Sequence, residues 1–338
     1  MAIWRVIYFP LASCVILLIG DRMGRQMDGM EAANAGASML KLSSISLFSM
    51  VGALAALHGG SVCMGQQTPP PRLPQVTSTA SALLEDQPVD ETGRPDWTSA
   101  RRFPSTRVYL QDGPGEMSFE QWLRQRDFTD GTKQSRFQEE LEIGLPYRFQ
   151  MDLYETWAVN EKRTVQQDET SVELRYALAD WGKIPLNPTL YVEYARVAGD
   201  ADTIEGKLLL GQDLAPRVHY GFNFAFEQQT TEAHSSAYTL SQGLSYTIID
   251  QTLSAGVEME YSIETEHGNR HDPTQGFVIG PSVQVRPSRQ THLDLVAMAG
   301  TNNYSPVMEA YVVFGIDFGK VTGRQEPQRY VPASVGGR

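Results

Sequence analysis

The feature that most constrains this chain is a period of two in its apolar residues, running from about Met117 to Phe318. A β-strand places every second side chain on the same face, so this period predicts strands with one apolar and one polar face. Between Arg217 and Glu227, for example, Val218 and four aromatic residues occupy alternate positions, and polar or small residues occupy the positions between them.

The alternating segments are also long. Most exceed the roughly 5–6 residues of an average soluble strand and match the roughly 9–11 residues that a tilted transmembrane strand needs. The links alternate between tight turns and wider polar segments, as in outer-membrane barrels with short periplasmic turns and longer external loops. We therefore predict an all-β, transmembrane, antiparallel up-and-down β-barrel over residues 104–318. Its twelve candidate strands are 116–127, 134–144, 147–158, 169–178, 188–197, 203–212, 217–228, 236–247, 251–263, 275–285, 290–298 and 306–318.

The first of these strands has an alternative. Ser118 followed by Gln121 resembles a helix capping box, and Phe119, Trp122 and Leu123 have helical spacing. If residues 116–127 were a helix, the first strand would lie at residues 105–111. We favour the strand because the short links make residues 134–144 an inward strand, which needs an outward strand before it, and residues 116–127 supply one.

Apolar and polar residues also alternate along the strands of a soluble β-sandwich. The residue types on the polar face therefore decide between a sandwich and a transmembrane barrel. That face carries far more charge than a dry interior tolerates, which favours an apolar outer belt around a wet or ion-paired lumen. The excess of carboxylates would favour cations over anions in an open path. The predicted lumen-lining charged residues are Arg136, Glu140, Glu142, Arg148, Asp152, Glu173, Arg175, Glu193, Glu205, Lys207, Glu227, Glu258, Glu260, Arg286, Asp294, Glu309 and Asp317.

Residues 1–65 read as a targeting region. Lys41 and the apolar run from Ile45 to Leu57 are typical of a secretory signal, and the run is shorter than the roughly 20 residues of a spanning helix. An earlier apolar stretch leaves two explanations: translation starts at Met39 and residues 1–38 are a start-site artefact, or the stretch is an extra anchor. We expect export to the bacterial outer membrane.

The regions flanking the barrel are expected to lack regular structure. Residues 66–103 begin with a proline-rich run and predict a periplasmic linker, and residues 319–338 predict a disordered tail. The last strand ends on Phe318 and resembles the terminal signal read by the barrel assembly machinery. The tail beyond it departs from that pattern.

The net charge and the cysteines exclude several functions. With 28 Lys and Arg against 40 Asp and Glu, the chain offers no basic stripe for nucleic acid. Both cysteines, Cys14 and Cys63, precede the barrel, so cysteine chemistry is excluded downstream.

Four stretches carry a resemblance to a known group: ELEIGLPYRFQMDLY, DWGKIPLNPTLYVEY, LLLGQDLAPRVHYGFNFAFE and GPSVQVRPSRQTHLDL. Over about Arg107 to Phe318 the chain resembles uncharacterised outer-membrane barrels, similar in pattern to candidate transporters of phenol-degradation operons. The resemblance implies a barrel and passive transport of a small polar or aromatic solute. It carries over no ligand residues.

Two patterns could suggest other chemistry. His234 and Ser236 have the spacing of an outer-membrane phospholipase, but the Asn-Gly that follows the serine in that family is missing. His267 and His271 lie among acidic residues and could hold a metal, yet Gly268 and Asn269 favour a solvated loop. We therefore expect no enzyme, metal or cofactor.

The sequence thus predicts a monomeric outer-membrane barrel in contact with lipid, acting as a passive channel for small solutes that prefers cations. The alternatives are a closed structural barrel and, as a third reading, a lipid-modifying enzyme. Charged networks filling a narrow lumen would favour the closed barrel.

Overall fold

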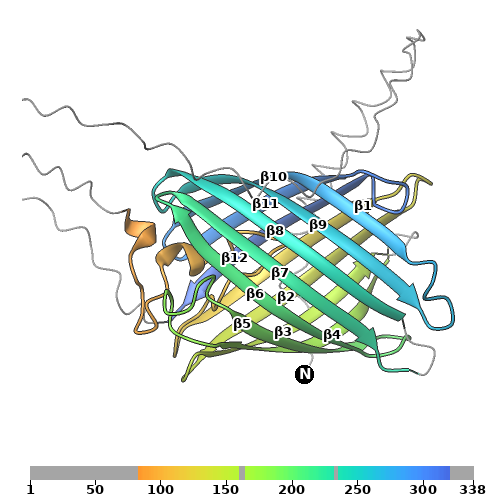
Figure 1. Ribbon diagram of the computed structural model, residues 1–338, viewed down its shortest axis with the longest axis horizontal. Helices are drawn as coiled ribbons and strands as arrows, with labels where there is room; N and C mark the ends of the chain where they lie inside the picture. The colour runs from red at the N-terminus through yellow and green to blue at the C-terminus, as the bar shows by residue number, and fades with distance from the viewer. Residues whose placement is uncertain (1–82, 160–163, 232–234, 320–338) are drawn as a thin grey trace, which may run out of the picture. The chain divides into compact units, whose positions relative to one another are not determined.

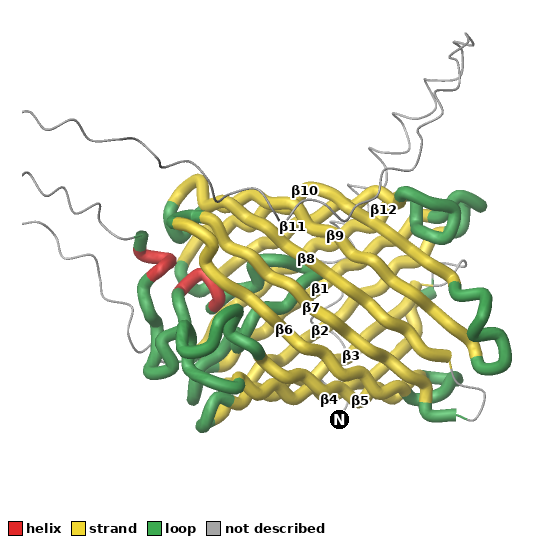
Figure 2. The backbone as a smooth tube through the Cα atoms, in the orientation of Figure 1, coloured by secondary structure: helices red, strands yellow, loops and turns green. Residues whose placement is uncertain are grey.

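The computed structural model describes residues 83–159, 164–231 and 235–319. Twelve antiparallel strands form one closed barrel in which each strand pairs with its neighbours along the chain and the first pairs with the last. Figures 1 and 2 show the tilted strands of this wall. The strands are β1 (Met117–Asp127), β2 (Lys133–Leu145), β3 (Phe149–Val159), β4 (Val165–Ala177), β5 (Thr189–Val197), β6 (Thr203–Ala215), β7 (Val218–Gln229), β8 (Ser235–Ile249), β9 (Leu253–Glu266), β10 (Thr274–Ser288), β11 (Thr291–Gly300) and β12 (Met308–Phe318).

The predicted barrel and its strand number are confirmed, and the helical alternative for residues 116–127 is wrong. These residues form β1, which pairs with β2 on one side and closes the barrel against β12 on the other. Ser118 does not cap a helix, because its hydroxyl donates to Asp112 and Glu142 inside the barrel. Pairing on both edges outweighs the helical spacing of three residues.

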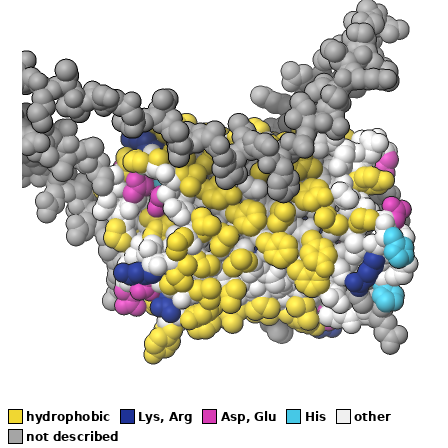
Figure 3. Space-filling view, viewed as in Figure 1, with side chains coloured by type: hydrophobic (Ala, Val, Ile, Leu, Met, Phe, Trp, Pro, Cys, Tyr) yellow, Lys and Arg dark blue, Asp and Glu magenta, His cyan; other side chains and the backbone are white. Residues whose placement is uncertain are grey.

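The outer surface of the barrel is apolar. Large side chains such as Leu174, Val192, Leu244 and Val257 are each at least 40% exposed on it. Figure 3 shows hydrophobic side chains over the middle of the barrel, with charged residues gathered towards its two ends. An apolar band between polar rims is what a transmembrane barrel presents to lipid, so this chain is an outer-membrane barrel. Within the described ranges, no helix has the length and apolar character needed to cross a membrane.

The two ends of the barrel differ in their connections. One end carries the turns at residues 146–148, 216–217, 250–252 and 289–290, together with the longer segment 178–188. The opposite end carries the other loops, including 267–273 and 301–307. Because outer-membrane barrels have short periplasmic turns, the first end is taken as periplasmic.

Residues 83–116, here called the plug, fold into the barrel instead of extending away from it. They contain two short 3-10 helices, η1 (Leu84–Asp86) and η2 (Asp96–Thr98), and every residue from 94 to 104 is buried. Residues 83–103 are therefore no extended linker, and residues 105–111 are no strand. The low content of apolar residues predicted a linker without regular structure. This segment is instead held largely by polar contacts with the barrel wall. The predicted signal at 1–65 and the tail beyond 319 lie outside the described residues.

Three inward-facing glycines accommodate the plug. A Cβ atom added at Gly243 would lie 2.5 Å from the ring of Phe103, and one at Gly221 would lie 2.8 Å from Val108. Gly211 also faces Val108. These glycines mark the close approach of a second chain segment, and not only the curvature of the sheet.

Candidate functional site

The centre of the lumen is an ion-pair cluster formed by one plug arginine and the barrel wall. The Arg101 guanidinium lies 2.6 Å from Glu120 of β1, 3.1 Å from Glu140 of β2 and 2.8 Å from Glu142 of β2. All three carboxylates are 0% exposed. Buried charges are tolerated only when they are paired, so Arg101 and these carboxylates depend on one another.

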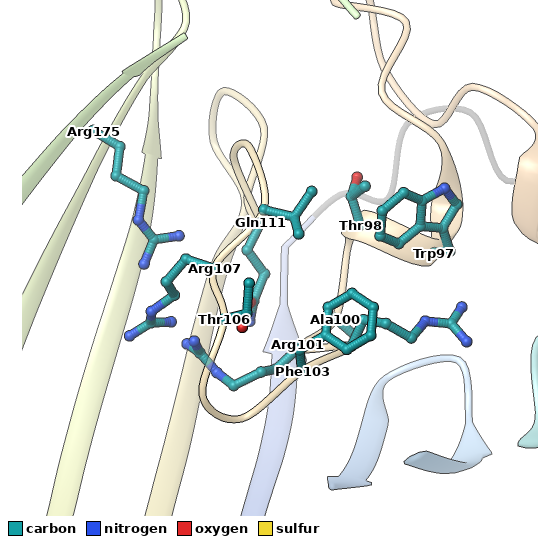
Figure 4. A pocket seen from close by; sticks show the side chains of 11 residues that line it. Trp97, Thr98, Ala100, Arg101, Phe103, Thr106, Arg107, Gln111 and Arg175 are labelled. Carbon is teal, nitrogen blue, oxygen red and sulfur yellow. The ribbon is translucent and has the colours of Figure 1, made fainter. Parts of the chain in front are cut away.

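Two further arginines meet at the same place, as Figure 4 shows for Arg101, Arg107 and Arg175. Arg107 of the plug contacts Glu140 at 2.8 Å and Glu142 at 3.2 Å. Arg175 of β4 contacts Asp152 at 2.6 Å and also pairs with Glu173. The cavity between the plug and this wall has room for about one water molecule.

Polar contacts also join the plug to the opposite wall. The backbone amide and hydroxyl of Ser105 donate to Glu258 of β9 at 2.8 and 2.6 Å. Asn223 of β7 pairs with the backbone of Arg107 through two hydrogen bonds of 2.7 Å. Near the periplasmic end, Arg286 of β10 lies 2.9 Å from Asp96. The plug is therefore bonded to β1 and β2 on one side of the lumen and to β7, β9 and β10 on the other.

Six acidic residues face one another across neighbouring strands, and we call them the acidic ladder. Each is the direct cross-strand partner of the next, from β2 to β7: Glu142, Asp152, Glu173, Glu193, Glu205 and Glu227. Strands in a barrel are tilted, so directly paired residues climb along the barrel axis. The ladder accordingly begins near the periplasmic end of β2 and finishes near the external end of β7.

The charge along the ladder is unevenly compensated. Its inner members pair with Arg101, Arg107 and Arg175 as described above. Of its outer members, Glu205 lies 2.6 Å from Lys207, whereas Glu227 is exposed. Like charges placed directly opposite one another destabilise a sheet. Among the described residues, the outer half of the ladder therefore carries more carboxylates than cations that pair with them.

A smaller basic surface lies on β1 and β2 in the outer half of the lumen. It carries Arg124, Arg126 and Arg136, which line a pocket together with Gln134. Arg124 and Arg126 both pair with Glu309, at 2.6 and 3.1 Å. The outer lumen thus has an acidic wall and a partly neutralised basic wall.

The remaining predicted lumen residues occupy several environments. Glu258, Asp294 and Glu309 are buried, and Glu260 and Asp317 are partly buried. Arg148 lies in the turn after β2 and contacts Asp180 at 3.2 Å, so it belongs to the periplasmic rim. Arg136 pairs with Asp168 at 3.0 Å near the external end. Among the predicted lumen arginines, Arg175 pairs with carboxylates of the wall, and Arg286 pairs with Asp96 of the plug.

Sequence reasoning missed the plug residues. Arg94, Arg101, Arg102 and Arg107 form an arginine-rich stretch that precedes a barrel wall with too many carboxylates. The positive charge of this stretch complements the negative charge of the wall, and the inward glycines leave room for a second segment. Together these two features of the sequence could have predicted a segment inside the barrel. Glu120 was missed because the strand that carries it was uncertain.

Two groups of described residues bring three potential metal-ligating atoms within 4.8 Å of one another. Glu120, Glu140 and Glu142 form the first, which is already neutralised by arginine. Glu85, Asp86 and His219 form the second. The loop histidines His267 and His271 belong to neither group, and His234 of the phospholipase-like pair lies outside the described residues.

Comparisons with known proteins find no matching family model and no matching curated protein. Among solved structures, the chain is similar to an outer-membrane channel from Pseudomonas putida F1 with a TM-score of 0.45 and 9% identity, over 62% of this chain and 98% of that one. It is similar to the NanC porin with a TM-score of 0.42 and 8% identity, over 60% and 99% of the two chains. The β domain of the Bordetella autotransporter BrkA gives 0.40 and 10%, over 61% and 100%. The expected relation to phenol-operon transporters stays a prediction.

Proposed function

We propose that this protein is a passive outer-membrane channel for small cations, and that its own plug closes the inner half of the lumen at rest. The acidic ladder is the observation that carries this proposal. It places carboxylates along the lumen from the external end of β7 to the ion-pair cluster around Arg101. Rings and rows of carboxylates select cations in other pores.

Conduction through such a barrel requires the plug to move. The inner ladder is neutralised by arginines of the plug, so displacing the plug would remove two cations, Arg101 and Arg107, from the path. The same movement would widen the lumen and make it more acidic. Opening and cation preference would then have one cause.

A disulfide lock tests this mechanism. An added Cβ at Gly221 would lie 3.0 Å from Cγ2 of Thr106, close enough for paired cysteines at these positions to be bridged. The same Cβ would lie 2.8 Å from Cγ2 of Val108, so Val108→Ala is included to make room for it. No native cysteine follows Cys63 to compete. We expect the oxidised Thr106→Cys/Val108→Ala/Gly221→Cys protein to be silent in planar bilayers and the reduced protein to show cation-selective events.

Selectivity is tested separately from opening. Glu205→Gln should shift the reversal potential of the reduced protein in a KCl gradient towards that of a less selective pore. Glu155→Gln is the matched control, because Glu155 lies on the outward face of β3 and should leave the potential unchanged. Anion-selective events in the reduced protein would contradict the proposed cation preference.

One observation favours the alternative of a closed structural barrel, namely the complete burial of the cluster around Arg101. A buried network of this kind resists opening because each charge would need a new partner. If the folded protein stays silent both locked and unlocked, the structural barrel is the better explanation.

A further inference from the structure

The plug and the barrel wall meet at the periplasmic end around one histidine. His219 is the second residue of β7 and is 0% exposed. Glu85 and Asp86 of η1 lie against it, and the ring of Trp97 stacks on its imidazole with centroids 4.5 Å apart. The cluster therefore combines side chains from the plug with one from the wall.

The two ring nitrogens of His219 have different surroundings. Nδ1 lies 2.8 Å from Oδ1 of Asp213 at the end of β6. Nε2 lies 3.2 Å from Oε1 of Glu85 and 3.9 Å from Oδ1 of Asp86 in the plug, and 3.4 Å from the hydroxyl of Thr247 on β8. A proton on Nδ1, donated to Asp213, would leave the lone pair of Nε2 directed towards these two carboxylates.

We propose that Nε2 of His219, Oε1 of Glu85 and Oδ1 of Asp86 bind a divalent transition metal ion such as Zn²⁺. Metal-ligating histidines usually donate their other ring N–H to a carboxylate, which is the position that Asp213 holds. Ligands about 2 Å from a tetrahedral zinc ion lie about 3.3 Å apart, close to the separation between His219 and Glu85. Asp86 would have to move only slightly.

Asp86 gives independent support. Its Oδ1 is buried, yet no hydrogen-bond donor among the described residues reaches it. A buried carboxylate oxygen without a partner is costly, and a metal ion would supply one. Asp86 and Asp213 are also partly exposed, so an ion has a path from the periplasmic side.

The alternative is an imidazolium held between two carboxylates. In that state burial disfavours the charged form of Glu85, but the hydrogen bond from His219 and the charge of Arg102 outweigh burial and lower the pKa of Glu85 to about 2. The unpartnered oxygen of Asp86 favours the metal ion, because an imidazolium already bonded to Asp213 and Glu85 has no further proton for it. Imidazole with carboxylates suits zinc, copper or nickel, whereas calcium prefers oxygen ligands alone.

Metal bound at this position would join η1 to β7 and so fasten the start of the plug to the wall. This site does not depend on the proposed transport function, because binding can be measured in a barrel that never conducts. The loop histidines offer a second place where zinc could bind, so the experiment has to separate the two.

The test uses the full chain, purified in detergent and freed of metal with a chelator. Zn²⁺ binding is measured by calorimetry, and Co²⁺ is used as a spectroscopic probe of the ligand geometry. We expect one ion per chain, with affinity reduced at least tenfold in Asp86→Asn and in Asp213→Asn, and abolished in His219→Gln. Asp86→Asn is the decisive variant, because it removes a carboxylate without a hydrogen-bond partner and should leave the metal-free barrel folded.

The matched control is the double variant His267→Ala/His271→Ala, which should bind zinc as the unaltered protein does. Loss of binding in this control, with full binding in Asp86→Asn, would assign the ion to the external loop and overturn the proposal. Absence of any stoichiometric binding would overturn it as well.

Discussion

Arg101→Met offers the sharpest test of how the plug is held. This substitution removes the one cation that contacts Glu120, Glu140 and Glu142 together. Glu140 and Glu142 keep Arg107, but Glu120 keeps only hydrogen bonds from Gln111 and Trp122 and a 3.5 Å contact with His292. Glu120 is then a poorly compensated carboxylate with 0% exposure.

The expected magnitude follows from the burial of these groups. Removing one partner of a buried ion pair costs about 3–5 kcal/mol. The barrel can avoid most of that cost by releasing the plug, which lets water reach the carboxylates. At about 1.4 kcal/mol per factor of ten, plug docking should weaken by about 140- to 3,700-fold.

The assay compares the fraction of open time in planar bilayers and the cleavage of residues 83–116 by added protease. Arg136→Met is the matched control, because Arg136 is 50% exposed and, among the described residues, forms its ion pair with Asp168. An exposed pair contributes about 0–1 kcal/mol, so this variant should behave as the unaltered protein. Adding Glu120→Gln to Arg101→Met should recover part of the lost docking. Unchanged opening and unchanged protection of the plug in Arg101→Met would refute the view that the buried ion pairs hold it.

Three further results are expected. Gly243→Val should expel Phe103, because a Cβ atom there already lies 2.5 Å from its ring, and so increase protease cleavage of the plug; Gly206→Val, with only a backbone oxygen 4.0 Å away, should not. In the metal-free protein the pKa of Glu85 is lowered from 4.5 to about 2, so its share of plug docking is present above pH 4.5 and is lost as the pH falls towards 2. Protease protection of the plug should fall across this range in the metal-free protein, and Glu85→Gln should remove that fall. Val257→Arg, on the lipid face of β9, should lower the free energy of barrel unfolding by about 2–4 kcal/mol if it lies at the bilayer midplane, measured by urea titration in lipid vesicles.

The sequence alone determined the wall of this protein. A period of two is a local property, visible within each strand, and it assigns side chains to the two faces without knowledge of distant residues. Strand length and alternating links then separated a transmembrane barrel from a soluble sheet. The assignment of residues 116–127 was the exception, because a few residues with helical spacing left strand and helix both open.

Only the tertiary structure decided what fills the barrel. Residues 83–116 have no periodic pattern, and their order depends on partners far away in the chain: Arg107 bonds to Asn223 across 116 positions, and Ser105 to Glu258 across 153. The acidic ladder likewise depends on the register between strands, which no single strand specifies. The ion pairs and the close contacts at glycine join residues that lie far apart in the sequence and meet only in the closed sheet. They can therefore be identified only from the tertiary structure.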